Sequence, residues 1–215
     1  MGAAVPGRTV VILGRGERCV PYGDDMLSIG GLLRNRRAGQ DKLAWNLPDL
    51  AGPDILDLRS PEVPAESTMP REHVAKRAGG DNVSPSLTWD EAPAGTAELL
   101  LVVEDPDAPT PRPWVHCVAL LDAGLTELTA GALGKGRNAS GVRVLRATMG
   151  RGYQGPEALK GHGPHRYVFQ LFALPEPLPA APGGRPVERA GPRAVLGAAP
   201  GPVLARGRWD VLFER

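Results

Sequence analysis

"GHGPHRYVFQLFAL", residues 161–174, decides the fold and points to the site. The apolar and aromatic run at 166–174 has the length and composition of a buried strand. His162 and His165 come just before and at the start of it, in a loop broken by Gly and Pro. Titratable rings at the mouth of a buried strand indicate the rim of a pocket.

Other segments of the chain also have the pattern of short strands. The runs at 97–104 and 114–121 are continuously apolar, as in buried strands, and the remaining segments are shorter or alternate. The full set is 54–58, 85–89, 97–104, 114–121, 142–147, 166–174 and 208–214. Gly and Pro are abundant between them and helical windows are few, so the sequence predicts a mainly β, antiparallel sandwich or barrel. One late helix is expected near 191–199, with Pro192 in its first turn.

Bulk composition excludes several classes of protein. The 215 residues suit one domain, or one domain with an appendage. A net charge of +1 gives no sign of a nucleic-acid binder. The apolar run at 10–13 is too short for a signal peptide or an integral membrane segment. The two cysteines, Cys19 and Cys117, do not suggest a disulfide framework, and we expect a cytoplasmic protein.

Residues 1–50 differ from the rest and are expected to form an N-terminal extension of a domain at 51–215. Met26, Ile29 and Leu32 have helical spacing, which predicts a short amphipathic helix at about 25–37 with a basic end. We favour packing of this helix on the main domain or on a second subunit, so a homodimer is possible. A membrane-surface or partner contact is the alternative. Met26 is also a possible start of the chain.

The alternation of side chains along strands suggests which residues face a cavity. In a regular strand, Trp114 and His116 share one face with Val118. His165 shares a face with Tyr167, so these two side chains are expected to line one cavity. Arg166 points the other way and is expected to form a structural ion pair.

The segment "EDPDAP", residues 104–109, adds a carboxylate held in place by proline. Asp105 at a strand end can accept a hydrogen bond from His116 or His165, which would raise the pKa of that histidine. Two such histidines, with backbone N–H groups of a glycine loop, would form a receptor for phosphate or carboxylate. Each residue also has a purely structural interpretation when it is considered alone. Asp107 is expected to be a turn residue, His116 could as easily be a core histidine as a pocket residue, and His162 is expected to be a loop residue without a special role.

These motifs resemble the phosphatidylethanolamine-binding protein family, in its bacterial Raf-kinase-inhibitor-like branch. The resemblance covers residues 53–215 and rests on "DPDAP", "WVH" and "GHGPHRY" in that order. It implies an antiparallel β-sandwich with a large central sheet, a smaller sheet and a few peripheral helices. It also implies a small pocket for phosphate-like anions, with these residues as ligand-binding positions: Asp105, Pro109, Trp114, His116, Gly155, His165 and Tyr167. The sequence departs from the family at "EALK", residues 157–160, where relatives usually have further prolines.

Two kinds of function remain open from the sequence. The first is a binding protein for a small anionic ligand, such as phosphate, phosphoethanolamine or a carboxylate, without a cofactor. The second is an enzyme that uses Asp105, His116 and His165 for general acid–base chemistry on a small metabolite. A metal site of histidine and carboxylate ranks last, and no metal is expected. Regulation by contact with a protein such as a kinase has no support in the residues.

Overall fold

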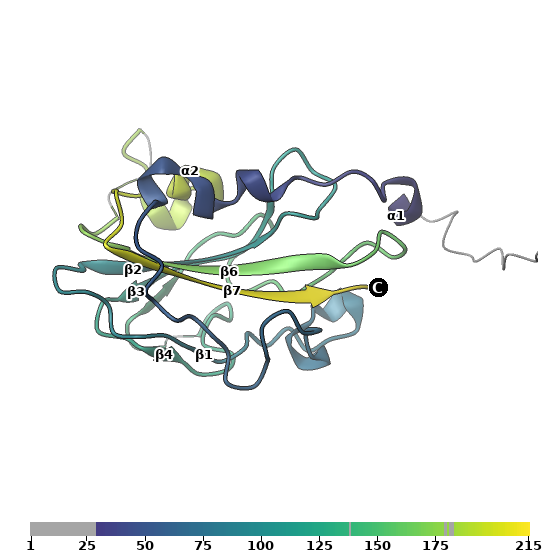
Figure 1. Ribbon diagram of the computed structural model, residues 1–215, viewed down its shortest axis with the longest axis horizontal. Helices are drawn as coiled ribbons and strands as arrows, with labels where there is room; N and C mark the ends of the chain where they lie inside the picture. Colours follow the sequence, from purple (N-terminus) through teal and green to yellow (C-terminus); the bar gives the residue numbers. More distant parts are fainter. Residues whose placement is uncertain (1–28, 138, 179, 181–182) are drawn as a thin grey trace, which may run out of the picture.

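The computed structural model describes residues 29–137, 139–178, 180 and 183–215. In this part of the chain, five antiparallel strands form one sheet in the order β5-β3-β2-β6-β7, and β1 pairs with β4 separately. Figure 1 shows the larger sheet in the middle of the molecule, with β1 and β4 on one side and α2 on the other. The strands are β1 Leu87–Thr88, β2 Glu98–Asp105, β3 Trp114–Asp122, β4 Glu127–Leu128, β5 Val142–Val144, β6 His165–Leu174 and β7 Ala205–Phe213.

The central strands are apolar on both faces because both faces of the sheet are covered. Leu99 and Leu101 of β2 point into one core cluster, whereas Leu100 and Val102 point into the other. The first core lies between the large sheet and the β1–β4 side. The second lies under the helical layer and includes Ala44 and Leu50 of the predicted N-terminal extension. The predicted mainly β fold class is therefore confirmed.

Helices in the described residues are short. They are α1 Ile29–Leu32, α2 Pro192–Leu196 and the 3-10 turns η2 Gln40–Lys42, η3 Ala44–Asn46, η4 Pro48–Leu50, η5 Arg71–His73, η6 Lys76–Ala78 and η7 Val187–Arg189. The predicted late helix begins at Pro192 as expected. Among the described residues, no helix is long and apolar enough to cross a membrane.

The predicted helix at about 25–37 is mostly wrong where it can be compared. The described part is helical only at Ile29–Leu32, and Met26 and Cys19 lie outside the described residues. After α1 the chain continues through residues 33–39, called the strap here, which begin as turns and contain no regular secondary structure. In it, Ala38 N–H donates to Ala108 O (2.9 Å) and Gly39 N–H donates to Pro106 O (2.9 Å). These bonds tie the strap to the "DPDAP" turn.

Two of the predicted strands are shorter than expected and one is a single bridge. Segment 85–89 contains only β1, segment 142–147 contains only β5, and segment 54–58 joins β7 only through Asp54 opposite Arg206. Segment 54–58 follows the edge of β7 through scattered bonds such as Leu56 N–H to Arg206 O (3.1 Å). It therefore covers an exposed sheet edge without forming a regular ladder.

A β-bulge in β3 corrects the predicted facing of His116. Val103 of β2 pairs with Cys117, but the next residue, Glu104, pairs with Val115, so His116 is an extra residue in β3. The bulge interrupts the alternation of side chains. The His116 ring consequently packs edge-on against Tyr167, at 5.0 Å between ring centroids, instead of following Val118 into the opposite core.

Candidate functional site

A cavity of about 500 Å³ opens where the end of β2 and the starts of β3 and β6 meet. This edge of the sheet lies toward the end of the molecule where α1 and the C-terminal end of β7 are found (Figure 1). Six of the seven predicted ligand-binding residues line the cavity: Asp105, Pro109, Trp114, His116, Gly155 and His165. The seventh, Tyr167, is buried behind His116 and forms its support.

Asp105 is a buried carboxylate with a full set of hydrogen bonds. Its Oδ1 accepts the backbone N–H groups of Asp107 (2.8 Å) and Ala108 (3.0 Å), which closes the "DPDAP" turn. Its Oδ2 accepts a hydrogen bond from Nδ1 of His165 (2.7 Å). Of the two histidines that the sequence offered as partners, the structure selects His165. Asp105 therefore orients His165 and does not hydrogen-bond to His116.

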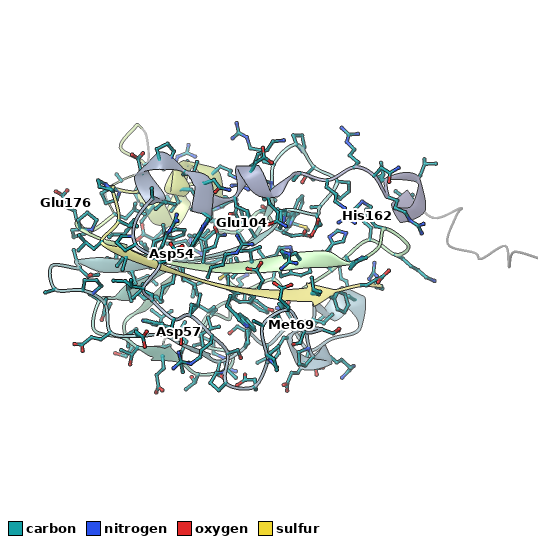
Figure 2. All side chains as sticks on the ribbon, in the orientation of Figure 1. Asp54, Asp57, Met69, Glu104, His162 and Glu176 are labelled. Atoms are coloured by element: carbon teal, nitrogen blue, oxygen red, sulfur yellow. The ribbon has the colours of Figure 1, made fainter. Side chains whose placement is uncertain are left out.

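His162 is a central residue of the site, although the sequence suggested a loop residue without a role. Its side chain is completely buried. Its Nδ1 lies 2.7 Å from Nε2 of His165, and its Nε2 lies 2.8 Å from the carbonyl oxygen of Leu33 in the strap. Figure 2 shows His162 close to α1. The loop folds back because Gly161 and Gly163 have positive φ angles, of 76° and 95°, which glycine adopts without strain.

Three contacts connect Asp105 to His165, His165 to His162, and His162 to the carbonyl oxygen of Leu33, and together they determine how many protons these side chains carry. A carbonyl oxygen only accepts, so His162 donates from Nε2 and His165 donates from Nδ1 to the carboxylate. The contact between the two rings needs one more proton. The three contacts thus need three protons in total, which leaves Asp105, His165 and His162 together without net charge. Both ring nitrogens of His165 are occupied within the protein.

His116 is the histidine with a ring nitrogen directed to the cavity. Its Nδ1 donates to the carbonyl oxygen of Gln154 (2.8 Å), and Nε2 has no hydrogen-bond partner among the described residues. Burial lowers the pKa of His116 below its ordinary value of 6.5, although the nearby Asp105 carboxylate acts in the opposite direction. At neutral pH the ring is therefore uncharged, and Nε2 presents a lone pair.

The walls of the cavity are fixed by close contacts. The Tyr167 hydroxyl accepts the Glu157 N–H (3.1 Å), and burial raises the pKa of this tyrosine well above its ordinary range. A Cβ at Gly155 would lie 2.3 Å from the carbonyl oxygen of His73, so only glycine fits there. The Gly155 N–H donates to Asn82 Oδ1 (2.8 Å). This amide is therefore already used within the protein.

The structure gives little support for metal ligation, a reactive Cys117 thiol or a role of Arg166 at this site. No group of three or more His, Cys, Asp or Glu side chains in the described ranges is arranged to hold a metal ion. Burial raises the pKa of the Cys117 thiol to about 12, so it is not a nucleophile at neutral pH. Arg166 pairs with Glu66 and Asp210 on the other face of β6, as expected of a structural ion pair.

Comparison with known proteins places this geometry in a family. The phosphatidylethanolamine-binding protein family matches residues 59–214. The Escherichia coli UPF0098 protein YbhB is 40% identical over 111 residues, which are 49% of this chain and 70% of that protein. The Mycobacterium bovis UPF0098 protein Mb1945c is 35% identical over 140 residues, which are 65% of this chain and 64% of that protein.

A solved structure agrees with the sequence matches. E. coli YbcL, described as a new member of the mammalian PEBP family, has a TM-score of 0.65 and 29% identity to this chain. The similarity covers 75% of this chain and 99% of YbcL. A PEBP homologue from Chlamydia trachomatis shares the fold, with a TM-score of 0.59 at 23% identity. The family match covers most of the chain and the solved structures share its fold, so the chain belongs to the phosphatidylethanolamine-binding protein family.

Proposed function

We propose that the protein binds a small organic anion, with a phosphate or carboxylate group held at Nε2 of His116. The observation that supports this most strongly is the position of that nitrogen. It faces a cavity of small-molecule size, whereas both nitrogens of His165 are bonded within the protein. Asp105, His165 and His162 together are neutral. They form a rigid floor for the cavity and add no net charge.

Binding of an anion at His116 is coupled to uptake of a proton. The neutral ring offers a lone pair, which repels a fully ionised oxygen but accepts a hydrogen bond from a protonated one. An anion that enters the cavity therefore stabilises the protonated form of His116, whose ring can then donate from Nε2. Affinity should fall as the pH rises above the pKa of His116 in the complex.

Calorimetric titration with phenyl phosphate tests this proposal. We expect binding by the wild-type protein, with proton uptake seen as a heat that depends on the ionisation enthalpy of the buffer. His116→Gln should remove the proton uptake and weaken binding by about tenfold, the loss of one charge-assisted hydrogen bond. His73→Gln is the matched control, because His73 is also buried but does not line the cavity. Absence of binding by folded wild-type protein would contradict the proposal.

General base catalysis at His116 is the second candidate function. It is favoured by the lowered pKa, since a neutral imidazole with an accessible Nε2 and a fixed Nδ1 donor can accept a proton from a bound substrate. Asp105 and His165 would then act only as supports. Incubation with a metabolite mixture should give a product that His116→Gln does not form, and no turnover by either protein would rule this candidate out for those metabolites.

A further inference from the structure

The cavity is much larger than a single acid group requires. Its volume of about 500 Å³ lies within the range of sites that enclose a whole small molecule. A phosphate group at His116 would fill only the inner part. The rest of the ligand would contact the residues of the lining that lie farther from His116, so their chemistry indicates what kind of molecule fits.

Three positively charged side chains, Lys76, Arg77 and Arg215, belong to the cavity lining. None of them forms a salt bridge among the described residues. Glu157 is the one side-chain carboxylate in the lining besides Asp105, whose charge His165 and His162 already balance. Arg215 is the last residue of the sequence, so its α-carboxylate offsets its own guanidinium, and the excess of charge comes from Lys76 and Arg77. Positive charge therefore exceeds negative charge at the mouth, which attracts an acid group.

The protein holds these cations beside the deep site. η6, which begins at Lys76, directly follows Ala75, and the Ala75 N–H donates to Pro156 O (3.1 Å). The Arg215 guanidinium donates to the carbonyl oxygen of Arg77 (3.4 Å). The backbone that presents the charges is thus attached to the same wall that contains Gly155.

An apolar surface also belongs to the lining. Trp114, Pro109 and Leu159 contribute to it, together with Met149, whose residue surface is 45% exposed. Large apolar side chains left exposed in a cavity favour an apolar or aromatic ligand body.

We propose that the site is built for an organic molecule with two acid groups separated by an apolar body. One acid group binds at His116, the body contacts Trp114 and Met149, and the second acid group binds the cations of Lys76, Arg77 and Arg215. This inference rests on the proposed function, because it assumes that the first acid group binds at His116.

Titration calorimetry with a matched set of ligands tests the second binding point. The probes are phenyl phosphate and its 3-carboxy and 4-carboxy derivatives, which add one carboxylate at two distances from the phosphate. With wild-type protein, at least one carboxy derivative should bind about five- to tenfold more tightly than phenyl phosphate. The double variant Lys76→Gln/Arg77→Gln should lose this ratio.

The control variant Lys135→Gln/Arg137→Gln makes the same change of charge outside the cavity lining. It should keep the ratio. If phenyl phosphate binds but neither carboxylate improves the affinity, the second binding point is wrong and the proposed function stands. If both double variants lose the ratio equally, the gain comes from overall charge and the inference is wrong. If phenyl phosphate does not bind at all, the proposed function itself fails.

Discussion

Replacing His162 with phenylalanine should lower the free energy of unfolding by about 2–4 kcal/mol. The change keeps a planar ring but removes the hydrogen bonds of a completely buried side chain to His165, Leu33 O and, at 3.2 Å, Arg36 O. Nε2 of His165 then stays buried without a partner, which costs about 1–3 kcal/mol, and the lost bond to Leu33 O contributes about 1 kcal/mol more. Urea unfolding measures the difference directly, and the melting temperature should fall by about 5–15 °C.

A matched control separates this effect from the general cost of changing a buried histidine. His73 is 1% exposed, and its ring makes one hydrogen bond, from Nδ1 to Val83 O (2.9 Å), whereas its Nε2 lies only at longer distances from Glu72 Oε1 (3.4 Å) and Glu62 Oε1 (3.9 Å). His73→Phe should therefore cost only about 1 kcal/mol. If His162→Phe is no more destabilising than His73→Phe, the contacts through His162 do not stabilise the site and the derived proton count loses its basis.

Three further predictions concern the same site. The folded protein lowers the pKa of His116, so the unfolded chain binds more protons than the folded protein below about pH 6.5. The free energy of unfolding should therefore decrease as the pH is lowered below about 6.5 and should not change with pH above it. Urea titrations at several pH values should show a weaker dependence on pH in His116→Gln. Asp105→Asn removes the charge that faces His165, and thermal melting should show a loss of about 3–5 kcal/mol, whereas an unchanged melting temperature would exclude a buried ion pair. Gly155→Ala forces a Cβ against the His73 carbonyl, so it should cost about 1–3 kcal/mol in urea unfolding and weaken phenyl phosphate binding, and normal values of both would show that the wall can move.

The sequence was sufficient for the strands that pack on both faces. β2, β3 and β6 are long, apolar and bounded by turns, so their composition alone indicates burial. It missed β4, because two paired residues give no periodic signal, and it overestimated the lengths of β1 and β5. It also overestimated α1, where Gly30 and Gly31 oppose a longer helix.

In the site, too, some features could be predicted from the local sequence, whereas others depend on how distant strands pair. Six of the predicted residues line the cavity: Asp105, Trp114, His116 and His165 follow from the ends and the alternation of strands, whereas Pro109 and Gly155 came from the resemblance to the family. The bulge at His116 depends on how β3 pairs with β2, which no local pattern specifies. The choice of His165 as the partner of Asp105 likewise depends on the pairing of distant strands. The close spacing of His162 and His165, with Gly161 and Gly163 on either side of His162, was the one local signal that pointed to their contact.

A crystal structure of the protein with bound phenyl phosphate tests the central claim most directly. We predict a phosphoryl oxygen at hydrogen-bond distance, about 3 Å, from Nε2 of His116, with the bond from His165 to Asp105 unchanged. A phosphoryl group bound to His165 after that bond has broken, or bound outside this cavity, would contradict the account.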